Sequence, residues 1–186
     1  YNVINSIEEL DTLLASSLEE GVLAIDTETD SLKASTAKII GISLSCMENE
    51  AFYIVLDHIK KENIKLDKRL VIERLNPILQ NKSVLKIGQN IKYDFQILLN
   101  NGFSEMYPME DTMLMSYTLH AGMHNHNLDY LSERYLGISK KKYKELVGAG
   151  KKEISFSKVD INEAMKYACE DADFTLKLWK LFKKKL

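Results

Sequence analysis

One stretch decides the fold of this chain: Val22-Leu23-Ala24-Ile25-Asp26-Thr27-Glu28-Thr29-Asp30. Four apolar residues run without a break into a cluster of three acids. A short apolar run with polar borders is typical of a buried strand in a parallel or mixed sheet. In open α/β sheets, binding sites lie at the carboxyl ends of such strands. We therefore expect a strand here, with a functional site at its acidic end.

The acids Asp26 and Glu28 are two residues apart, so on a strand their side chains point to the same face. Neighbouring carboxylates repel each other and resist removal from water. A bound cation relieves that repulsion, and an all-oxygen ligand set favours Mg²⁺ or Mn²⁺. The alternative, which is common for this pattern, is a solvated acidic loop that follows a strand. The rest of the chain has to favour one or the other.

The composition is that of a globular protein with a core: of 186 residues, 45% are hydrophobic and 28% are charged. This length suits one domain, by the rule of roughly 100–200 residues per domain. The net charge of −2 does not indicate nucleic-acid binding, although 25 Lys and Arg residues leave room for a local basic surface. Cys46 and Cys169 lie in apolar segments, which predicts buried reduced thiols and suits a cytoplasmic protein. No apolar run approaches the ~18 residues of a membrane helix.

The spacing of apolar residues predicts strands early in the chain and helices late. A capping box at Ser6–Glu9 opens a helix that reaches about Leu18, and Gly21 ends it. The other expected elements are a hairpin of strands 38–46 and 51–56, a strand at 83–88, and helices at 66–80, 90–101, 111–120, 128–136 and from 161 onward. Residues 139–157 are rich in Lys and Gly, so we expect them to be partly loop. This order favours a mixed sheet flanked by helices.

A second acidic site is expected near the C-terminus, where Tyr167 and Asp171 are four residues apart on a predicted helix. The two side chains share a face, and a phenol and a carboxylate on one face could hold a water and a metal ion together. The simpler alternative is an ordinary surface pair. Glu170 and Asp173 each stand four residues from a lysine, so we expect them to form solvated helix pairs.

Three motifs of the chain resemble those of DEDDy-type 3′–5′ exonucleases. They are Asp26-Thr27-Glu28, Gly88-Gln89-Asn90-Ile91-Lys92-Tyr93-Asp94 and Tyr167-x-x-x-Asp171. More narrowly, residues 26–32, the second motif, and segments 111–114 and 129–136 resemble the proofreading domain of bacterial DNA polymerase I. The tyrosine four before Asp171 separates this group from a sister group that has a histidine five before it. Each motif is weak alone, but together they follow the family's order along almost the whole chain.

The resemblance implies an RNase H-like α/β fold with a mixed five-stranded sheet, as a single 3′–5′ exonuclease domain over residues 1–186. It implies a two-metal mechanism with Mg²⁺ or Mn²⁺, in which ions about 3.5–4 Å apart act on the attacking water and on the leaving 3′ oxygen. Asp26 would bridge both ions. Glu28 and Asp171 would complete the first, and Asp94 would hold the second through waters. Tyr167 would orient the attacking water, with help from Glu28.

The resemblance also implies a grip on the end of a DNA strand, by Thr27, Leu32, Gln89, Asn90, Tyr93 and Tyr143. Leu32 would wedge against the terminal base and Tyr143 would stack on the frayed strand, which is a sequence-tolerant contact. Plain packing is the alternative for both. The lysines around Tyr143 suit a single-stranded backbone, and they are Lys140, Lys141, Lys142 and Lys144. Asn125 stands where the family pattern has an arginine, so one phosphate contact of the family is not matched here.

The implied function is the digestion of single-stranded or frayed DNA 3′ ends to 5′-mononucleotides, as proofreading in replication and repair. Two alternatives stay open: an RNase D-like exoribonuclease with the same four acids, and a catalytically silent scaffold module of a polymerase. Against them, the second motif has the polymerase form and all four acids are present. The chain begins at Tyr1 and not at Met, so we expect either a stand-alone relative or a domain cut from a polypeptide with a polymerase domain. Either would be cytoplasmic and nucleoid-associated, with no membrane.

Overall fold

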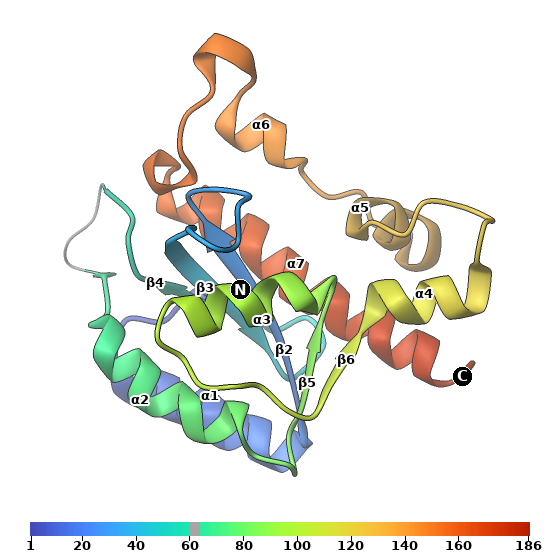
Figure 1. The fold of residues 1–186 in the computed structure, drawn as a ribbon, viewed down its shortest axis with the longest axis horizontal. Helices are drawn as coiled ribbons and strands as arrows, with labels where there is room; N and C mark the ends of the chain where they lie inside the picture. The colour runs from blue at the N-terminus through green and yellow to red at the C-terminus, as the bar shows by residue number, and fades with distance from the viewer. Residues whose placement is uncertain (60–63) are drawn as a thin grey trace.

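The computed structural model describes residues 1–59 and 64–186, and a six-stranded mixed sheet forms its centre (Figure 1). The strands are β1 (Asn2–Val3), β2 (Val22–Thr29), β3 (Ile39–Ser45), β4 (Phe52–Val55), β5 (Leu85–Gly88) and β6 (Met109–Asp111). Across the sheet their order is β1-β4-β3-β2-β5-β6. β3 pairs antiparallel with both β2 and β4, whereas β5 runs parallel to β2 and to β6. The expected mixed sheet is confirmed.

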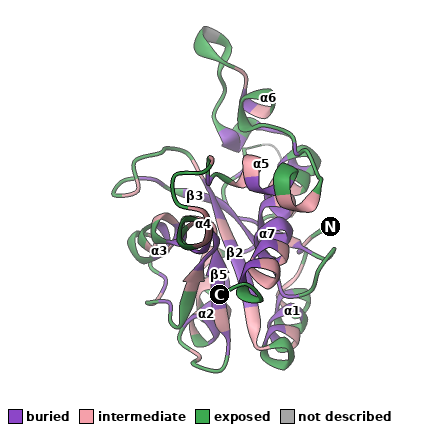
Figure 2. Cartoon of the chain, turned by 90° about the vertical axis from the view of Figure 1, so that its right-hand side faces the viewer, coloured by how far each residue is buried: buried purple, intermediate pink, exposed green. Residues whose placement is uncertain are grey.

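Helices pack on both faces of this sheet. They are α1 (Ile7–Glu20), α2 (Lys68–Leu79), α3 (Ile91–Asn100), α4 (Thr112–His120), α5 (Leu128–Leu131), α6 (Tyr143–Val147) and α7 (Ile161–Lys183). Leucines and isoleucines of α1, α2 and α3 form the largest core cluster with alternate residues of β2, β3 and β4. α7 covers the opposite face, where its alanines lie in one cluster with Ile40 and Tyr53. Figure 2 shows the result: most residues of β2, β3, β4 and β5 are buried.

The first helix begins and ends where the sequence predicts. The Ser6 hydroxyl accepts a hydrogen bond from the Glu9 amide (3.2 Å), which satisfies one free donor of the first turn. Gly21 ends the helix with a φ of 69°, a left-handed conformation that residues with a Cβ rarely adopt. Because β2 begins at the next residue, this cap sets the point at which the acidic strand enters the sheet.

Some short elements were not predicted. β1 and β6 have two and three residues, which is too few to show the alternation of a strand, and with them the sheet has six strands in place of the expected five. The predicted helix 128–136 is α5 followed by a π-helical turn, Ser132–Leu136, which ends at Gly137 with a φ of 69°. Residues 139–157 are partly loop, as expected, with α6 and short 3₁₀ turns between the loops.

Two expectations from composition also hold. Cys46 and Cys169 are free and buried, as predicted for reduced thiols. Within residues 1–59 and 64–186, no helix combines the length and the apolar character needed to cross a membrane.

Gly41 of β3 provides a sharp test of how the sheet is packed. A Cβ built on this residue would lie 2.1 Å from the Tyr53 hydroxyl oxygen, and Tyr53 is fully buried. Gly41→Ala should destabilise the protein by about 1–3 kcal/mol, because a buried ring cannot move without disturbing its neighbours. Urea unfolding followed by circular dichroism measures this loss.

Ser43→Ala is the matched control, two residues along the same strand and on the same face. The Ser43 hydroxyl is buried and has no hydrogen-bond partner in the part of the chain that the structure describes. Its removal should leave the free energy of unfolding unchanged or raise it. Equal stability of the Gly41→Ala and Ser43→Ala proteins would contradict the packing described here.

Candidate active site

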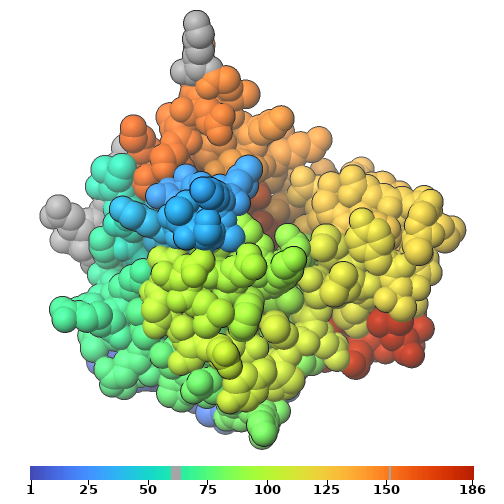
Figure 3. All heavy atoms as spheres, in the orientation of Figure 1, coloured from blue at the N-terminus to red at the C-terminus, as the bar shows by residue number. Residues whose placement is uncertain are grey.

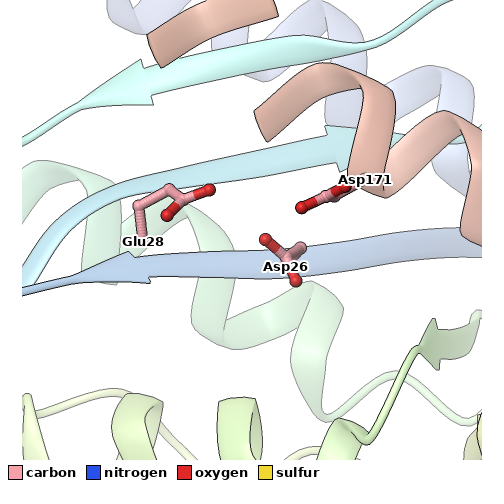
Figure 4. A group of neighbouring side chains, drawn as sticks. All are labelled: Asp26, Glu28 and Asp171. Carbon is pink, nitrogen blue, oxygen red and sulfur yellow. The ribbon is translucent and has the colours of Figure 1, made fainter. Parts of the chain in front are cut away.

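Three carboxylates from two elements meet between β2 and α7 (Figure 4). β2 places Asp26 and Glu28 on the sheet face that α7 covers, and Asp171 comes from α7 itself. Each residue offers one oxygen, and these oxygens all lie within 4.8 Å of one another. Asp26 is half-buried, and the other two residues are buried. The cluster is therefore compact enough for one cation to touch all three side chains.

The register of β2 sets this geometry. Ala24 packs against Leu176 of α7, so Asp26 and Glu28, two and four residues further on, face the same helix. The inner side of α7 is lined with alanines that are 0% exposed, namely Ala164, Ala168 and Ala172. Such small side chains let the helix lie close to the sheet, which brings Asp171 within reach of the strand.

Asp94 lies beside the cluster and is held by the strand. It comes from the first turn of α3 and is buried. Its carboxylate accepts hydrogen bonds from the Thr27 amide (2.9 Å) and the Thr27 hydroxyl (2.6 Å). It is not one of the three residues whose oxygens form the cluster. Asp94 is thus bonded to the residue between the two strand acids but stays outside the group of three.

Asp111 fixes the turn that delivers Asp94. One of its oxygens accepts hydrogen bonds from the amides of Asn90 (2.9 Å) and Met113 (2.8 Å), and the other accepts from the Ile91 amide (3.1 Å). Asn90 is left-handed (φ 60°) and its own side chain makes no cap, so Asp111 satisfies the free amides of α3 as well as those of α4. The sequence-based expectations gave Asp111 no role and placed it inside the helix 111–120, although an Asp at the start of a predicted helix signals an N-cap.

Burial and mutual repulsion raise the pKa values of these acids. Burial raises the pKa of Asp26 from 3.8 to about 6, and Lys140 opposes the rise. The pKa values of Glu28 and Asp94 lie well above their ordinary range, first because of burial and then because of the Asp26 charge. For Asp94, the hydrogen bonds from Thr27 pull in the other direction. Such groups resist ionising together unless positive charge compensates them.

Lys140 differs most from the sequence-based expectation. Its side chain is 2% exposed, and its ammonium donates a hydrogen bond to Asp171. The same nitrogen lies 3.8 Å from the Asp129 carboxylate and 4.3 Å from the centre of the Tyr167 ring. Lys140 was expected to suit a single-stranded backbone together with the other lysines around Tyr143, but the fold turns its side chain inward onto the acids.

Tyr167 stands on α7 one turn before Asp171 and beside the cluster. Burial, followed by the negative charges of Glu28 and Asp26, raises the pKa of its phenol, so the hydroxyl keeps its proton. Its ring meets the Tyr143 ring edge-on, with the centroids 6.2 Å apart. The structure thus places a protonated hydroxyl near the acids and an aromatic neighbour on its outer side.

Three of the residues expected to bind substrate are on the surface. Leu32, in the loop after β2, is 92% exposed, and Asn90 is also exposed. Tyr143 is 39% exposed and stacks on Phe156, with the centroids 6.1 Å apart and the planes at 5°. Figure 3 shows the surface hollowed between the loop after β2 (blue), the segment around α6 (orange) and the α4–α5 region (yellow). Leu32 and Tyr143 belong to two of the segments that border this hollow.

The other three have polar groups that are already bonded within the protein. The Gln89 side chain donates to the His126 carbonyl (2.7 Å) and accepts from the Thr112 hydroxyl (2.6 Å). The Tyr93 hydroxyl donates to a carbonyl of the loop after β2 (2.9 Å). Thr27 is bonded to the α3 carboxylate, as described above. Their polar groups are thus already engaged inside the protein.

Asp173 and Glu170 are not the solvated residues that the sequence suggested. Asp173 is fully buried and accepts hydrogen bonds from the Tyr1 hydroxyl (2.5 Å), the Asn49 amide (2.8 Å) and the Lys177 ammonium (2.7 Å). The expected pair with Lys177 is present, but the prediction that this pair is solvated is wrong. Glu170 is half-buried, and one of its oxygens has no partner among the residues described.

The raised pKa of Asp26 predicts how stability depends on pH in the presence of a chelator. An acid with a higher pKa in the folded state contributes its full stability at low pH, and the contribution is lost as the pH rises from 3.8 to about 6. Asp26→Asn imitates the protonated acid at every pH. The variant and the wild type should melt alike near about pH 4 and diverge by about 2–4 °C or more toward neutral pH, with the variant more stable.

Differential scanning calorimetry in excess EDTA measures both curves. Asp30→Asn is the control, because Asp30 is the exposed acid two residues beyond Glu28 and its curve should follow that of the wild type. If the wild type and Asp26→Asn keep a constant separation over this pH range, the raised pKa of Asp26 is refuted.

The comparisons with known proteins agree with one another. A family model described as 3′–5′ exonuclease matches residues 1–186. The chain is 38% identical to the DNA polymerase I of Rhizobium leguminosarum over 206 aligned positions, and 38% identical to that of Borreliella burgdorferi over 186. Each match covers 100% of this chain and 20% of the relative, so the chain spans about a fifth of the length of the curated relatives it matches.

Solved structures support the fold. Escherichia coli RNase D aligns with a TM-score of 0.74 at 17% identity, over 100% of this chain and 44% of that one. Brucella melitensis NrnC with bound Mg²⁺ aligns with a TM-score of 0.69 at 18% identity, over 100% of this chain and 79% of the NrnC chain. At such identities the likeness concerns the fold alone, and it confirms the expected RNase H-like architecture. The family model matches the whole chain, and two DNA polymerases I are similar to it over its full length. These two findings show that this chain belongs to the 3′–5′ exonuclease family.

Proposed function

We propose that this chain is a metal-dependent exonuclease domain that hydrolyses single-stranded or frayed DNA from its 3′ end and releases 5′-mononucleotides. The cluster of Asp26, Glu28 and Asp171 carries the proposal. Phosphodiester hydrolysis needs positive charge where negative charge develops, and a compact set of carboxylates can hold cations at such a place. Membership of the exonuclease family supports the reaction class and its direction.

The ligand set fits two Mg²⁺ or Mn²⁺ ions. Every donor in the described cluster is a carboxylate oxygen, which these hard cations prefer. In our proposal Asp26 would serve both ions. Glu28 and Asp171 would complete one site, and Asp94 would contribute to the other. The Mg²⁺ bound in the Brucella NrnC structure supports this choice of metal, and the ions would supply a more acidic water and positive charge beside the scissile phosphate.

Side chains of this protein would aim the reactants. The Tyr167 hydroxyl, which keeps its proton, would orient the attacking water by a hydrogen bond. Glu28 would help Tyr167 to hold the same water, since it shares the face of β2 that α7 covers. Leu32 would wedge against the terminal base, and Tyr143 would stack on the frayed strand, which tolerates any sequence.

The depth of the acids explains a preference for single strands. Glu28 and Asp171 are buried, so in our proposal a phosphate reaches them only if the terminal nucleotide enters without a paired partner. A paired end has to melt first, at a cost of about 1.4 kcal/mol for each stacked step. A mismatched end is already partly melted and should enter more easily. Such a preference is what proofreading requires.

The relatives favour DNA over RNA as the substrate. The two relatives at 38% identity are DNA polymerases, whereas RNase D shares the fold at 17% identity. Because the chain spans about a fifth of those polymerases, we propose that a polymerase domain of the same polypeptide hands over the 3′ end, at the nucleoid in the cytoplasm. A silent scaffold is a weaker candidate, because Asp26, Glu28 and Asp171 are present and gathered.

A time course on labelled strands tests the reaction class, its polarity and its substrate together. With Mg²⁺, a 5′-labelled single-stranded DNA should shorten as a ladder from its 3′ end, and a mismatched duplex end should be cut faster than a paired one. A 3′-blocked strand should be resistant, a 5′-blocked strand should not, and EDTA should stop the reaction. Faster digestion of a matched RNA would favour the RNase D-like alternative. Internal nicks in the labelled strand, or its full digestion in EDTA, would refute the proposal.

Two substitutions separate the proposed roles. Asp26→Ala removes the shared metal ligand and should leave almost no activity. Tyr167→Phe removes only a hydroxyl that aims the water, so the rate should fall by roughly 10²–10⁴-fold without reaching zero. Tyr107→Phe, at a 39% exposed tyrosine outside the site, is the control and should digest DNA like the wild type. Equal residual rates for Asp26→Ala and Tyr167→Phe would argue against these roles.

A further inference from the structure

Lys140 is a buried cation that the proposed mechanism does not use. It lies on the segment between the π-helical turn Ser132–Leu136 and α6, and its side chain is 2% exposed. Burying an ammonium group is costly unless it is paired with negative charge, so negative groups nearby have to compensate the charge of Lys140. The partner it contacts is Asp171, one of the three residues of the carboxylate cluster.

The ammonium and a divalent cation compete for the same carboxylate. Asp171 offers an oxygen to the cluster and accepts a hydrogen bond from Lys140. The Lys140 charge also acts on Asp26 and Glu28, since it lowers the pKa of both. A divalent cation between the three acids would therefore stand beside a fixed positive charge, and the two would repel each other.

The structure also offers a second partner for this ammonium. The Asp129 carboxylate of α5 lies 3.8 Å from the Lys140 nitrogen, and its side chain is 47% exposed. Asp129 is not a member of the carboxylate cluster. The four-carbon stem of lysine is flexible, so a small rotation moves the ammonium from one carboxylate to the other. The Lys140 nitrogen also lies 4.3 Å from the centre of the Tyr167 ring, whose face attracts a cation.

We propose that Lys140 is the resident counter-ion of the carboxylate cluster, which a divalent cation displaces toward Asp129. The inference rests on the proposed metal site and deepens it. Lys140 holds the acids together when no divalent cation is bound. Because it has to be displaced, it also weakens the affinity for the metal. Asp129 has the opposite effect, since it receives the displaced ammonium.

Calorimetric titration with MgCl₂ tests this on variants of the whole chain, without any activity assay. Lys140→Met removes the charge and keeps the length of the side chain, so it should bind Mg²⁺ about tenfold tighter or more. Asp129→Asn should bind Mg²⁺ more weakly than the wild type. In the Lys140→Met background, Asp129→Asn should have much less effect, because Asp129 acts through Lys140. Lys144→Met, at an exposed lysine in the first turn of α6, should bind like the wild type.

Thermal melting gives a second, independent readout. In EDTA, Lys140→Met should melt below the wild type, because three acids lose their counter-ion. Saturating Mg²⁺ should remove this deficit, because the metal takes over the role of the ammonium. Lys140→Arg keeps the positive charge, so it should keep the stability in EDTA and the weak Mg²⁺ affinity of the wild type.

The possible results divide cleanly. Weaker Mg²⁺ binding by Lys140→Met would mean that Lys140 orients Asp171 for the metal. An affinity like that of Lys144→Met would mean that Lys140 has no role in metal binding. Either result overturns the inference. So would a Lys140→Met protein that stays unfolded even in saturating Mg²⁺. No Mg²⁺ binding by the folded wild type is a different failure, because it would refute the proposed metal site itself.

Discussion

The structure depends on the repulsion between carboxylates that one strand carries into an apolar sheet. Asp26 and Glu28 share a face of β2, burial raises the pKa of both, and the Asp26 charge raises the pKa of Glu28 further. The neighbouring groups act on that charge in two ways. Lys140 brings a positive charge, and the Thr27 amide and hydroxyl stabilise Asp94, the acid beside the cluster. Removing these groups would leave a buried cluster of negative charge, which is costly in any fold.

The acids and their counter-ion lie on parts of the protein with different support. β2 is a strand of the sheet, and α3 and α7 pack on it. The two carboxylate oxygens of Asp111 also accept hydrogen bonds from amides at the start of α3. The segment with Lys140 and α6 stands out from this body in Figure 1 and is attached by a few buried residues such as Val147 and Phe156. The negative charges are thus fixed firmly, whereas the positive charge sits on a segment with less packing to hold it.

The sequence could predict the parts of the site that follow from simple periodicities. The two-residue period of a strand places Asp26 with Glu28, and the helical period places Tyr167 near Asp171. The meeting of these two pairs was expected from a family resemblance, because periodicity does not say which helix packs on which strand. The inward turn of Lys140 had no local signal, since it begins a run of three lysines that looks solvated. β1 and β6 were missed because strands so short exist only by pairing with their neighbours.

Asp171 and Asp173 show how the same residue type on one buried helix serves two purposes. Asp173 receives hydrogen bonds from the Tyr1 hydroxyl, the Asn49 amide and the Lys177 ammonium, so its charge is met by three fixed donors. These donors tie the N-terminus and the β3–β4 turn to α7, and they leave Asp173 little capacity for another ligand. Asp171 shares its surroundings with two other acids and a single flexible ammonium. Asp171 therefore has a less compensated surrounding, which suits its proposed role as a ligand of an added cation, whereas Asp173 serves as an anchor of the fold.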